Sequence, residues 1–192
     1  MNAGAYGGEM KDVVESVVFC YLQDQSLYEL TREQCAFGYR KSYFQSMPGC
    51  VILSAVFRLK PGEKSAISER MKELNGRRRE KQPLDLPSAG SAFRRPEGYY
   101  AAALIEECGL KGVSVGGAQV SEKHAGFIVN TGNAASKDLH DLMVYVRKTV
   151  YEQKHVQLEP EIILLPEDYR LEDHGPQVRR NTASSAVIDI EE

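Results

Sequence analysis

Residues 81–98, KQPLDLPSAGSAFRRPEG, limit the possible folds more than any other stretch, because three prolines and two glycines fall within them. Each proline fixes a backbone angle and removes an amide donor, so the segment predicts a stiffened loop that is neither helix nor strand. Gly90 permits a positive φ that would aim Ser91, while Arg94 and Arg95 offer forked donors for an anion. From the residues alone, two interpretations stand: a shaped binding loop, or a proline-rich domain connector with solvated arginines.

The chain before this loop reads as a hairpin, a long strand and a helix. Residues 13–22 are rich in β-branched and aromatic side chains, and a polar turn separates them from a short strand at 27–30. The strongest strand pattern is VILSAVFRL, residues 51–59, which a Pro-Gly pair ends. Apolar residues at helical spacing then predict a helix over 64–81. Its basic run, GRRREK, suits a solvated helix face better than a polyanion site.

The chain after the loop alternates helices with short strands. A helix is predicted at 99–108 and strands at 113–115 and 126–130. Residues 136–154 form the clearest amphipathic pattern, with Leu139, Leu142, Met143, Val146 and Val150 on one stripe. A last strand is predicted at 158–165, and from 166 onward the periodicity is lost, so we expect a disordered tail.

Composition describes an ordinary globular chain, with 42% apolar and 27% charged residues among 192. A net charge of −3 gives no broad electrostatic case for nucleic acid, and no apolar run approaches the length of a membrane span. The four cysteines include no CxxC pair, and no leader-like segment opens the chain, so reduced thiols, no metal site and a cytoplasmic location are expected.

Four other features carry a plain and a functional interpretation side by side. NAGAYGGE, residues 2–9, is either a flexible glycine-rich terminus or backbone suited to packing against a flat ligand or a phosphate. Arg40 lies among aromatic residues, which is typical of a stacked surface arginine. His124 reads as a surface-loop histidine. Glu161 is either solvated at a strand end or held at a functional site.

Five blocks in order resemble one family. PSAGSAFRRPEG (87–98) resembles a signature of the UDP-N-acetylenolpyruvoylglucosamine reductases, which are flavoenzymes of bacterial peptidoglycan synthesis. NAGAYGGE (2–9), FGYRKSYF (37–44) and LEPE (158–161) are similar to further blocks of that family, as are LIEECGLKG and GGAQVSEKHAGFIVN within 104–130. The resemblance covers residues 1 to about 166. The short segment after FGYRKSYF favours the family's shorter, second type.

The resemblance implies an α+β fold: the C-terminal part of a flavin-binding α+β domain at 1–81, then a small α/β substrate-binding domain at 82–166, with 167–192 as a tail. The family's N-terminal flavin-binding portion has no counterpart here, so we expect a C-terminal fragment, or a start at an internal methionine. A monomer is expected.

The resemblance also implies roles for individual residues. FAD would carry the hydride, NADPH would reduce the FAD, and UDP-N-acetylglucosamine enolpyruvate would be the substrate. Ser91 would donate a proton, while Arg40 and Glu161 would stabilise the developing charge at the substrate carboxylate. Substrate contacts fall to Arg94, Arg95 and His124, although the family commonly has lysine at the first of these. The cofactor loop comprises Asn2, Ala3, Gly4, Ala5, Tyr6 and Gly7. The alternative function is a catalytically silent UDP-sugar-binding remnant without flavin.

Overall fold

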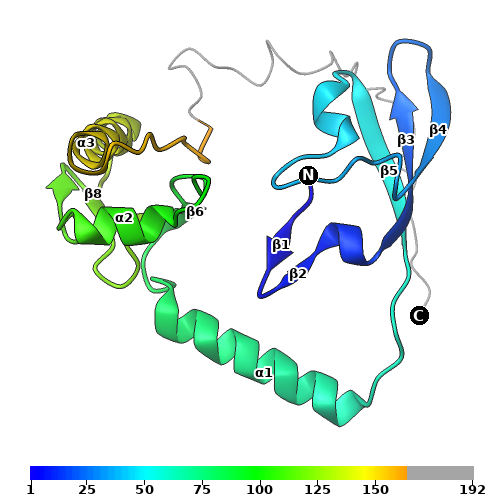
Figure 1. The fold of residues 1–192 in the computed structure, drawn as a ribbon, viewed down its shortest axis with the longest axis horizontal. Coiled ribbons are helices and arrows are strands. Elements are labelled where there is room, and N and C mark those ends of the chain that lie inside the picture. Colours follow the sequence, from blue (N-terminus) through cyan, green and yellow to red (C-terminus); the bar gives the residue numbers. More distant parts are fainter. Residues whose placement is uncertain (164–192) are drawn as a thin grey trace, which may run out of the picture. The chain divides into compact units, whose positions relative to one another are not determined.

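The computed structural model describes residues 1–163. These residues fall into two compact units, the first Met1–Glu80 and the second from Lys81 onward. Figure 1 labels the helices and strands of both. Each unit is described by itself. The predicted tail at 167–192 lies outside the described residues.

A three-stranded antiparallel sheet forms the centre of the first unit. β3 (Val14–Tyr21) lies between β4 (Ser26–Thr31) and β5 (Cys50–Phe57). The β3–β4 turn is fixed by Asp24, whose carboxylate accepts from the Ser26 amide at 2.9 Å and from the Tyr28 hydroxyl at 2.7 Å. The predicted hairpin and the predicted strand at 51–59 are therefore confirmed, the latter as β5.

A smaller hairpin precedes this sheet and was missed by the strand patterns. β1 (Gly4–Ala5) pairs with β2 (Gly8–Glu9), and a 3₁₀ turn, η1 (Met10–Asp12), leads into β3. A second 3₁₀ turn, η2 (Tyr43–Ser46), precedes β5. The core of the unit is small: Val14, Val17 and Cys35 are buried, and Phe37 and Phe44 pack against them.

The helix predicted at 64–81 is confirmed as α1 (Lys64–Lys81), and no residue of it is buried. Helix-favouring residues and ion pairs along one face account for it, since Glu73 pairs with both Arg70 and Arg77. Its apolar side chains Ile67 and Met71 remain exposed.

The second unit packs helices against a four-stranded sheet with the strand order β6-β9-β8-β7. The strands are β6 (Ser88–Ser91), β7 (Ser114–Val115), β8 (Ala118–Val120) and β9 (Phe127–Asn130), and the helices are α2 (Ala101–Glu107) and α3 (Ser136–Lys154). Both predicted helices and two predicted strands are confirmed, whereas β8 was missed. Every strand pair is antiparallel, so this unit is α+β and not α/β in the strict sense.

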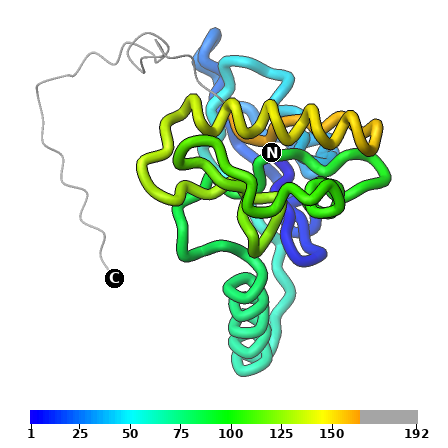
Figure 2. Tube along the Cα trace, turned by 90° about the vertical axis from the view of Figure 1, so that its left-hand side faces the viewer, coloured from blue at the N-terminus to red at the C-terminus, as the bar shows by residue number. Residues whose placement is uncertain are grey.

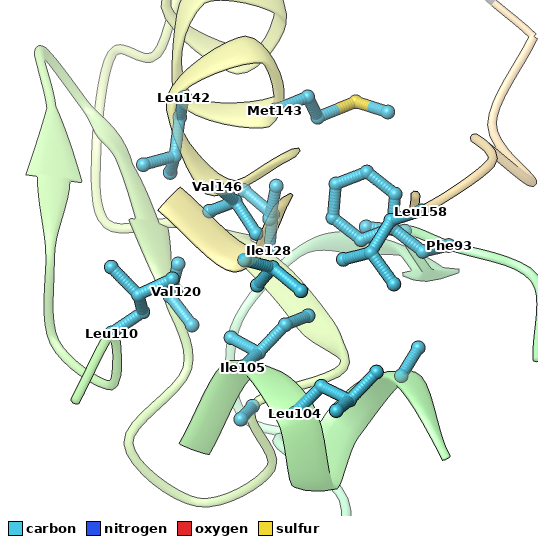
Figure 3. Close-up of a cluster of buried hydrophobic side chains, with 14 of the residues drawn as sticks. Phe93, Leu104, Ile105, Leu110, Val120, Ile128, Leu142, Met143, Val146 and Leu158 are labelled. Atoms are coloured by element: carbon cyan, nitrogen blue, oxygen red, sulfur yellow. The ribbon is translucent and has the colours of Figure 1, made fainter. Parts of the chain in front are cut away.

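One apolar core holds the second unit together. α3 lies over β7 and β8 and contacts α2 (Figure 2). Its stripe of Leu142, Met143, Val146 and Val150 is buried in the same cluster as Ile128 of β9 and Leu104 and Ile105 of α2. Figure 3 shows Val146 beside Ile128 in this core. The amphipathic pattern read from the sequence therefore marks the face that builds the core.

Two predictions about this unit were wrong. The loop at 81–98 does contain a strand, β6, because pairing of Ser88 with Val129 and of Ser91 with Phe127 orders a segment whose own sequence shows no strand pattern. Conversely, the described part of 158–165 is no strand. It makes an isolated bridge between Pro160 and Phe93, since proline has no amide to extend a ladder.

No helix within residues 1–163 combines the length and the apolar character needed to cross a bilayer.

Candidate active site

A polar hollow of about 420 Å³ opens beside the small N-terminal hairpin of the first unit. It brings together every residue of the predicted cofactor loop except Ala3, and it adds Arg40 of the FGYRKSYF block. The lining comprises Asn2, Gly4, Ala5, Tyr6, Gly7, Gly8, Glu9, Lys11, Asp12, Tyr39 and Arg40.

Asn2 holds this hollow in shape. Its side chain is buried, and its Nδ2 donates to Glu9 Oε2 at 2.9 Å and to the Gly38 carbonyl oxygen at 3.2 Å. Its Oδ1 accepts from the Lys11 amide at 3.0 Å. These bonds join the glycine-rich loop to the turn that carries Arg40, so the Asn2 amide group positions two walls of the hollow.

Arg40 occupies a left-handed backbone conformation, with φ of 52°. The turn around it is closed by the Gly38 and Lys41 backbones, whose two mutual hydrogen bonds are 3.0 and 3.2 Å long. Gln45 Nε2 donates to the Arg40 carbonyl at 3.0 Å, and the guanidinium lies 5.6 Å from the Tyr39 ring centroid. A non-glycine residue in this conformation persists only where its surroundings impose it, as functional turns often do.

Three charged residues of the hollow were missed in the sequence. Glu9 and Lys11 form an ion pair of 2.8 Å, and the Lys11 hydrogen bond holds the pKa of Glu9 below its usual value. Asp12 Oδ2 accepts from the Glu9 amide at 2.8 Å. In the sequence, these three residues were indicated only by a cluster of charge directly after the glycine-rich loop.

In the second unit, Ser91 and Glu161 come close together although they are far apart in the sequence. Ser91 ends β6 and is exposed. The next residue, Ala92, donates its amide to the Gly126 carbonyl at 2.8 Å and accepts from the Glu161 amide at 2.9 Å. Gly90 has a φ of 87°, so the irregular part of β6 just before Ser91 requires the freedom of glycine.

Arg94 and Arg95 line a separate hollow of about 240 Å³ with Pro96, Glu97, Gln157 and Glu159. Arg94 lies 3.7 Å from the Glu159 carboxylate. The Arg95 guanidinium stacks 4.0 Å from the Tyr100 ring centroid, and its Nε donates to the Tyr99 carbonyl at 3.3 Å. Contacts with Glu159, Tyr99 and Tyr100 thus orient the two arginines. Gln157, which lines the same hollow, was not singled out in the sequence.

His124 is half-buried in a tight turn. Its Nδ1 accepts from the Gly126 amide at 3.1 Å, and its ring lies edge-on to Phe127 with centroids 4.9 Å apart. Burial lowers the pKa of His124, and nearby Lys111 lowers it further. The accepting Nδ1 places the proton of the neutral ring on Nε2. The structure therefore uses one ring nitrogen to shape the turn, a role that the surface-loop interpretation missed.

The candidate residues fall into two groups. Arg40 lies with the glycine-rich loop in the first unit, whereas Ser91, Glu161, Arg94, Arg95 and His124 lie in the second. Within residues 1–163, no cluster of histidine, cysteine and carboxylate side chains could hold a metal ion, and all four cysteines are free thiols.

Comparison with known proteins identifies similar chains. The family model for the C-terminal domain of UDP-N-acetylenolpyruvoylglucosamine reductase matches residues 82–165. The reductase of Caldanaerobacter subterraneus subsp. tengcongensis is 52% identical over 167 residues, which are 87% of this chain and 55% of that protein. The Clostridioides difficile reductase is 51% identical over 88% of this chain and 55% of its own length. The chain thus spans about half the length of these curated relatives.

A solved structure agrees with these matches. The crystal structure of UDP-N-acetylenolpyruvylglucosamine reductase from Thermus caldophilus superposes with a TM-score of 0.72 and 38% identity. The superposition covers 86% of this chain and 58% of that one.

Proposed function

Because the chain belongs to the UDP-N-acetylenolpyruvoylglucosamine reductase family, whose C-terminal part it covers, we propose that it supplies the substrate-binding part of that reductase. The reaction would convert UDP-N-acetylglucosamine enolpyruvate to UDP-N-acetylmuramate for peptidoglycan precursors. The observation that carries the proposal is the backbone hydrogen bond from Glu161 to Ala92, the residue after Ser91, within the matched residues 82–165.

The chemistry sets what these side chains must do. An enol ether conjugated to a carboxylate accepts a hydride at its β-carbon, and negative charge spreads toward the carboxylate before a proton reaches the α-carbon. We assign the proton to the Ser91 hydroxyl, whose alkoxide is then reprotonated from solvent. Arg40 would stabilise the carboxylate charge directly. Glu161 would do so only as a neutral acid that donates a hydrogen bond, because an ionised carboxylate would repel the charge.

FAD, reduced by NADPH, would supply the hydride when bound. The first unit offers a fitting surface, because a Cβ placed on Gly7 would meet no atom within 4 Å and the backbone there is open to a flat ligand. The hollow of about 420 Å³ would take part of such a cofactor. Tyr6, Tyr39 and the loop backbone would hold it, and Asn2 would keep the two walls in register.

The substrate would reach the second unit through its anionic groups. Arg94 and Arg95 present two guanidinium groups in one hollow, an arrangement suited to phosphate oxygens. Glu97 and Glu159 share that hollow, so an anion must compete with carboxylates for the same donors. This competition favours a multiply charged group such as a diphosphate over a single carboxylate.

Calorimetric titration of the chain with UDP-N-acetylglucosamine enolpyruvate tests the proposal. Saturable binding is expected, and Arg94→Ala with Arg95→Ala should weaken it by about tenfold or more. Lys148→Ala removes an exposed cation of α3 and is the matched control, which should leave the affinity unchanged. Absence of binding by the unmodified chain would refute the proposal.

The remnant alternative draws on one observation, the coverage of only about half of the relatives. It predicts the same binding of the UDP-sugar without any use of FAD. To separate the two cases, the chain is combined with the relatives' remaining portion, and FAD, substrate and NADPH are added. The absorbance of NADPH is then followed. NADPH consumption that requires substrate supports the reductase, and none supports the remnant.

A further inference from the structure

The imidazole of His124 packs directly on the backbone of the turn between β8 and β9. Its Nδ1 accepts from the Gly126 amide at 3.1 Å, and the His124 carbonyl accepts from the Phe127 amide at 2.9 Å. A Cβ placed on Gly126 would lie 3.0 Å from the ring Cε1 and 3.3 Å from Cβ of Ala102 in α2. The imidazole and α2 therefore enclose the Gly126 backbone so closely that any side chain there would force them to shift.

Gly126 connects this turn to the strand end that carries Ser91. Its carbonyl accepts from the Ala92 amide at 2.8 Å, and the neighbouring pair in the ladder is Ser91 with Phe127. The ladder between β6 and β9 is irregular from Ser88 to Ser91, so regular pairing gives this strand end little support. Because glycine has the widest choice of backbone angles, the contact with the imidazole is what restricts Gly126.

The imidazole is itself held in place. Ser121 is buried, and its Oγ accepts from the amides of Lys123 and His124 at 3.2 Å each, which fixes the backbone at the start of the turn. The ring of Phe127 lies edge-on to the imidazole with centroids 4.9 Å apart. A side chain fixed at both its backbone and its ring can restrict a neighbour, whereas a freely rotating surface histidine cannot.

We propose that His124 is a positioning residue of the reaction: through the Gly126 backbone, it fixes the end of β6 that carries Ser91. The inference rests on the proposed function, in which Ser91 donates the proton. It differs from a substrate contact because it uses Nδ1 and the backbone, whereas a substrate contact would use Nε2. A proton donor must lie within hydrogen-bond reach of the atom that it protonates, so a small displacement of Ser91 slows the transfer.

The contact requires a neutral ring, since Nδ1 accepts a hydrogen bond only while it carries no proton. Four charged residues flank His124 in its turn or act on the ring from other elements: Glu122, Lys123, Glu106 and Lys111. Burial lowers the pKa of His124, Lys111 lowers it further, and Glu106 raises it. The contact with Gly126 is therefore complete above pH 6.5 and is lost as the pH falls through the lower folded pKa. Protonation of the substrate should decline over the same range.

Two substitutions of similar size separate positioning from substrate contact. Asparagine carries its amide oxygen on Cγ, as histidine carries Nδ1, so His124→Asn keeps an acceptor beside the Gly126 amide that does not titrate. His124→Leu has the same branching without an acceptor, and both variants lose Nε2. In the protein completed with the family's remaining portion and FAD, His124→Leu should slow flavin reoxidation by substrate about 10- to 100-fold and leave flavin reduction by NADPH unchanged.

His124→Asn should keep the reoxidation rate within about threefold and remove its decline below pH 6.5, because its acceptor cannot be protonated. His140→Asn makes the same change at an exposed histidine of α3 and should alter neither half-reaction nor its pH dependence. Equal slowing of reoxidation by His124→Asn and His124→Leu would assign His124 to the substrate and overturn the proposal.

Hydrogen exchange on the chain alone tests the same contact without any activity. With the intrinsic pH dependence of exchange removed, the Ala92 and Gly126 amides should exchange about tenfold faster in His124→Leu, as the loss of one hydrogen bond predicts. The unmodified chain should lose protection between pH 7.5 and 5, and His124→Asn should not. Unchanged protection in His124→Leu would overturn the proposal. If the completed unmodified protein failed to reduce the substrate, the proposed function would be refuted, and the exchange rates would still decide whether His124 holds the strand end.

Discussion

The backbone amide of Glu161 donates to the carbonyl oxygen of Ala92 at 2.9 Å, and this bond places Glu161 beside the strand end that carries Ser91. Ala92 is also bonded to Gly126, whose carbonyl oxygen accepts from the Ala92 amide at 2.8 Å. Residues 158–161 therefore act as a brace for the Ser91 loop. Contacts of this kind fix the geometry of the loop that carries Ser91.

Leu158 packs residues 158–161 into the core, so truncating the Leu158 side chain should destabilise the second unit. The Leu158 side chain is fully buried, and Arg147 Nε donates to its carbonyl at 2.9 Å. Leu158→Ala should lower the free energy of unfolding by about 2–5 kcal/mol in urea titration, through lost burial and the cavity left behind. Ile163→Ala, at a site 84% exposed, is the control and should change it by less than about 0.5 kcal/mol. Equal effects would mean that the segment is not anchored.

Periodic segments could be predicted from the sequence, and segments ordered by distant partners could not. The α3 stripe and α1 were read correctly because their patterns are local. β6 was missed because SAGS becomes a strand only through pairing with β9, and the strand expected at 158–165 was wrong because Pro160 limits it to a single bridge.

The candidate site shows the same division between local and distant signals. Motifs indicated Arg40, Ser91 and Glu161, but the positioning bonds of Asn2 and the packing of His124 depend on contacts that the sequence does not display.

His124 should make the stability of the second unit depend on pH. Burial holds its pKa below 6.5, so on acidification the unfolded chain takes up a proton that the folded unit resists. The contribution is present in full above pH 6.5 and is lost as the pH falls toward the lower folded pKa. Urea titrations from pH 7.5 to 5 should show a shallower decline for His124→Gln than for the unmodified chain. His140→Gln, which removes an exposed histidine of α3, is the control. If His140→Gln changed the pH dependence of the unfolding free energy as much as His124→Gln does, the assignment to His124 would be contradicted.

Two substitutions at Arg40 separate its backbone from its charge. Because φ is 52°, Arg40→Gly should be more stable than Arg40→Ala by about 1 kcal/mol in urea titration, since only glycine adopts this conformation without penalty. Both variants lack the guanidinium, so both should slow substrate reduction in the completed enzyme by about 10²- to 10³-fold. Equal stability would mean that the turn relaxes, and unchanged reduction would remove Arg40 from the mechanism.

The role of Ser91 is tested most directly by stopped-flow measurement of the two half-reactions in the protein completed with the family's remaining portion and FAD. Reduction of the flavin by NADPH needs no proton at the substrate α-carbon, whereas reduction of the enolpyruvyl group does. Ser91→Ala should leave the first rate near normal and slow the second by at least about 10²- to 10⁴-fold, the range of a general acid. Ser88→Ala is the control and should do much less, since Ser88 Oγ accepts from the Gly90 amide at 3.3 Å as a turn residue. Equal slowing of both half-reactions by Ser91→Ala, or no slowing of either, would contradict the account.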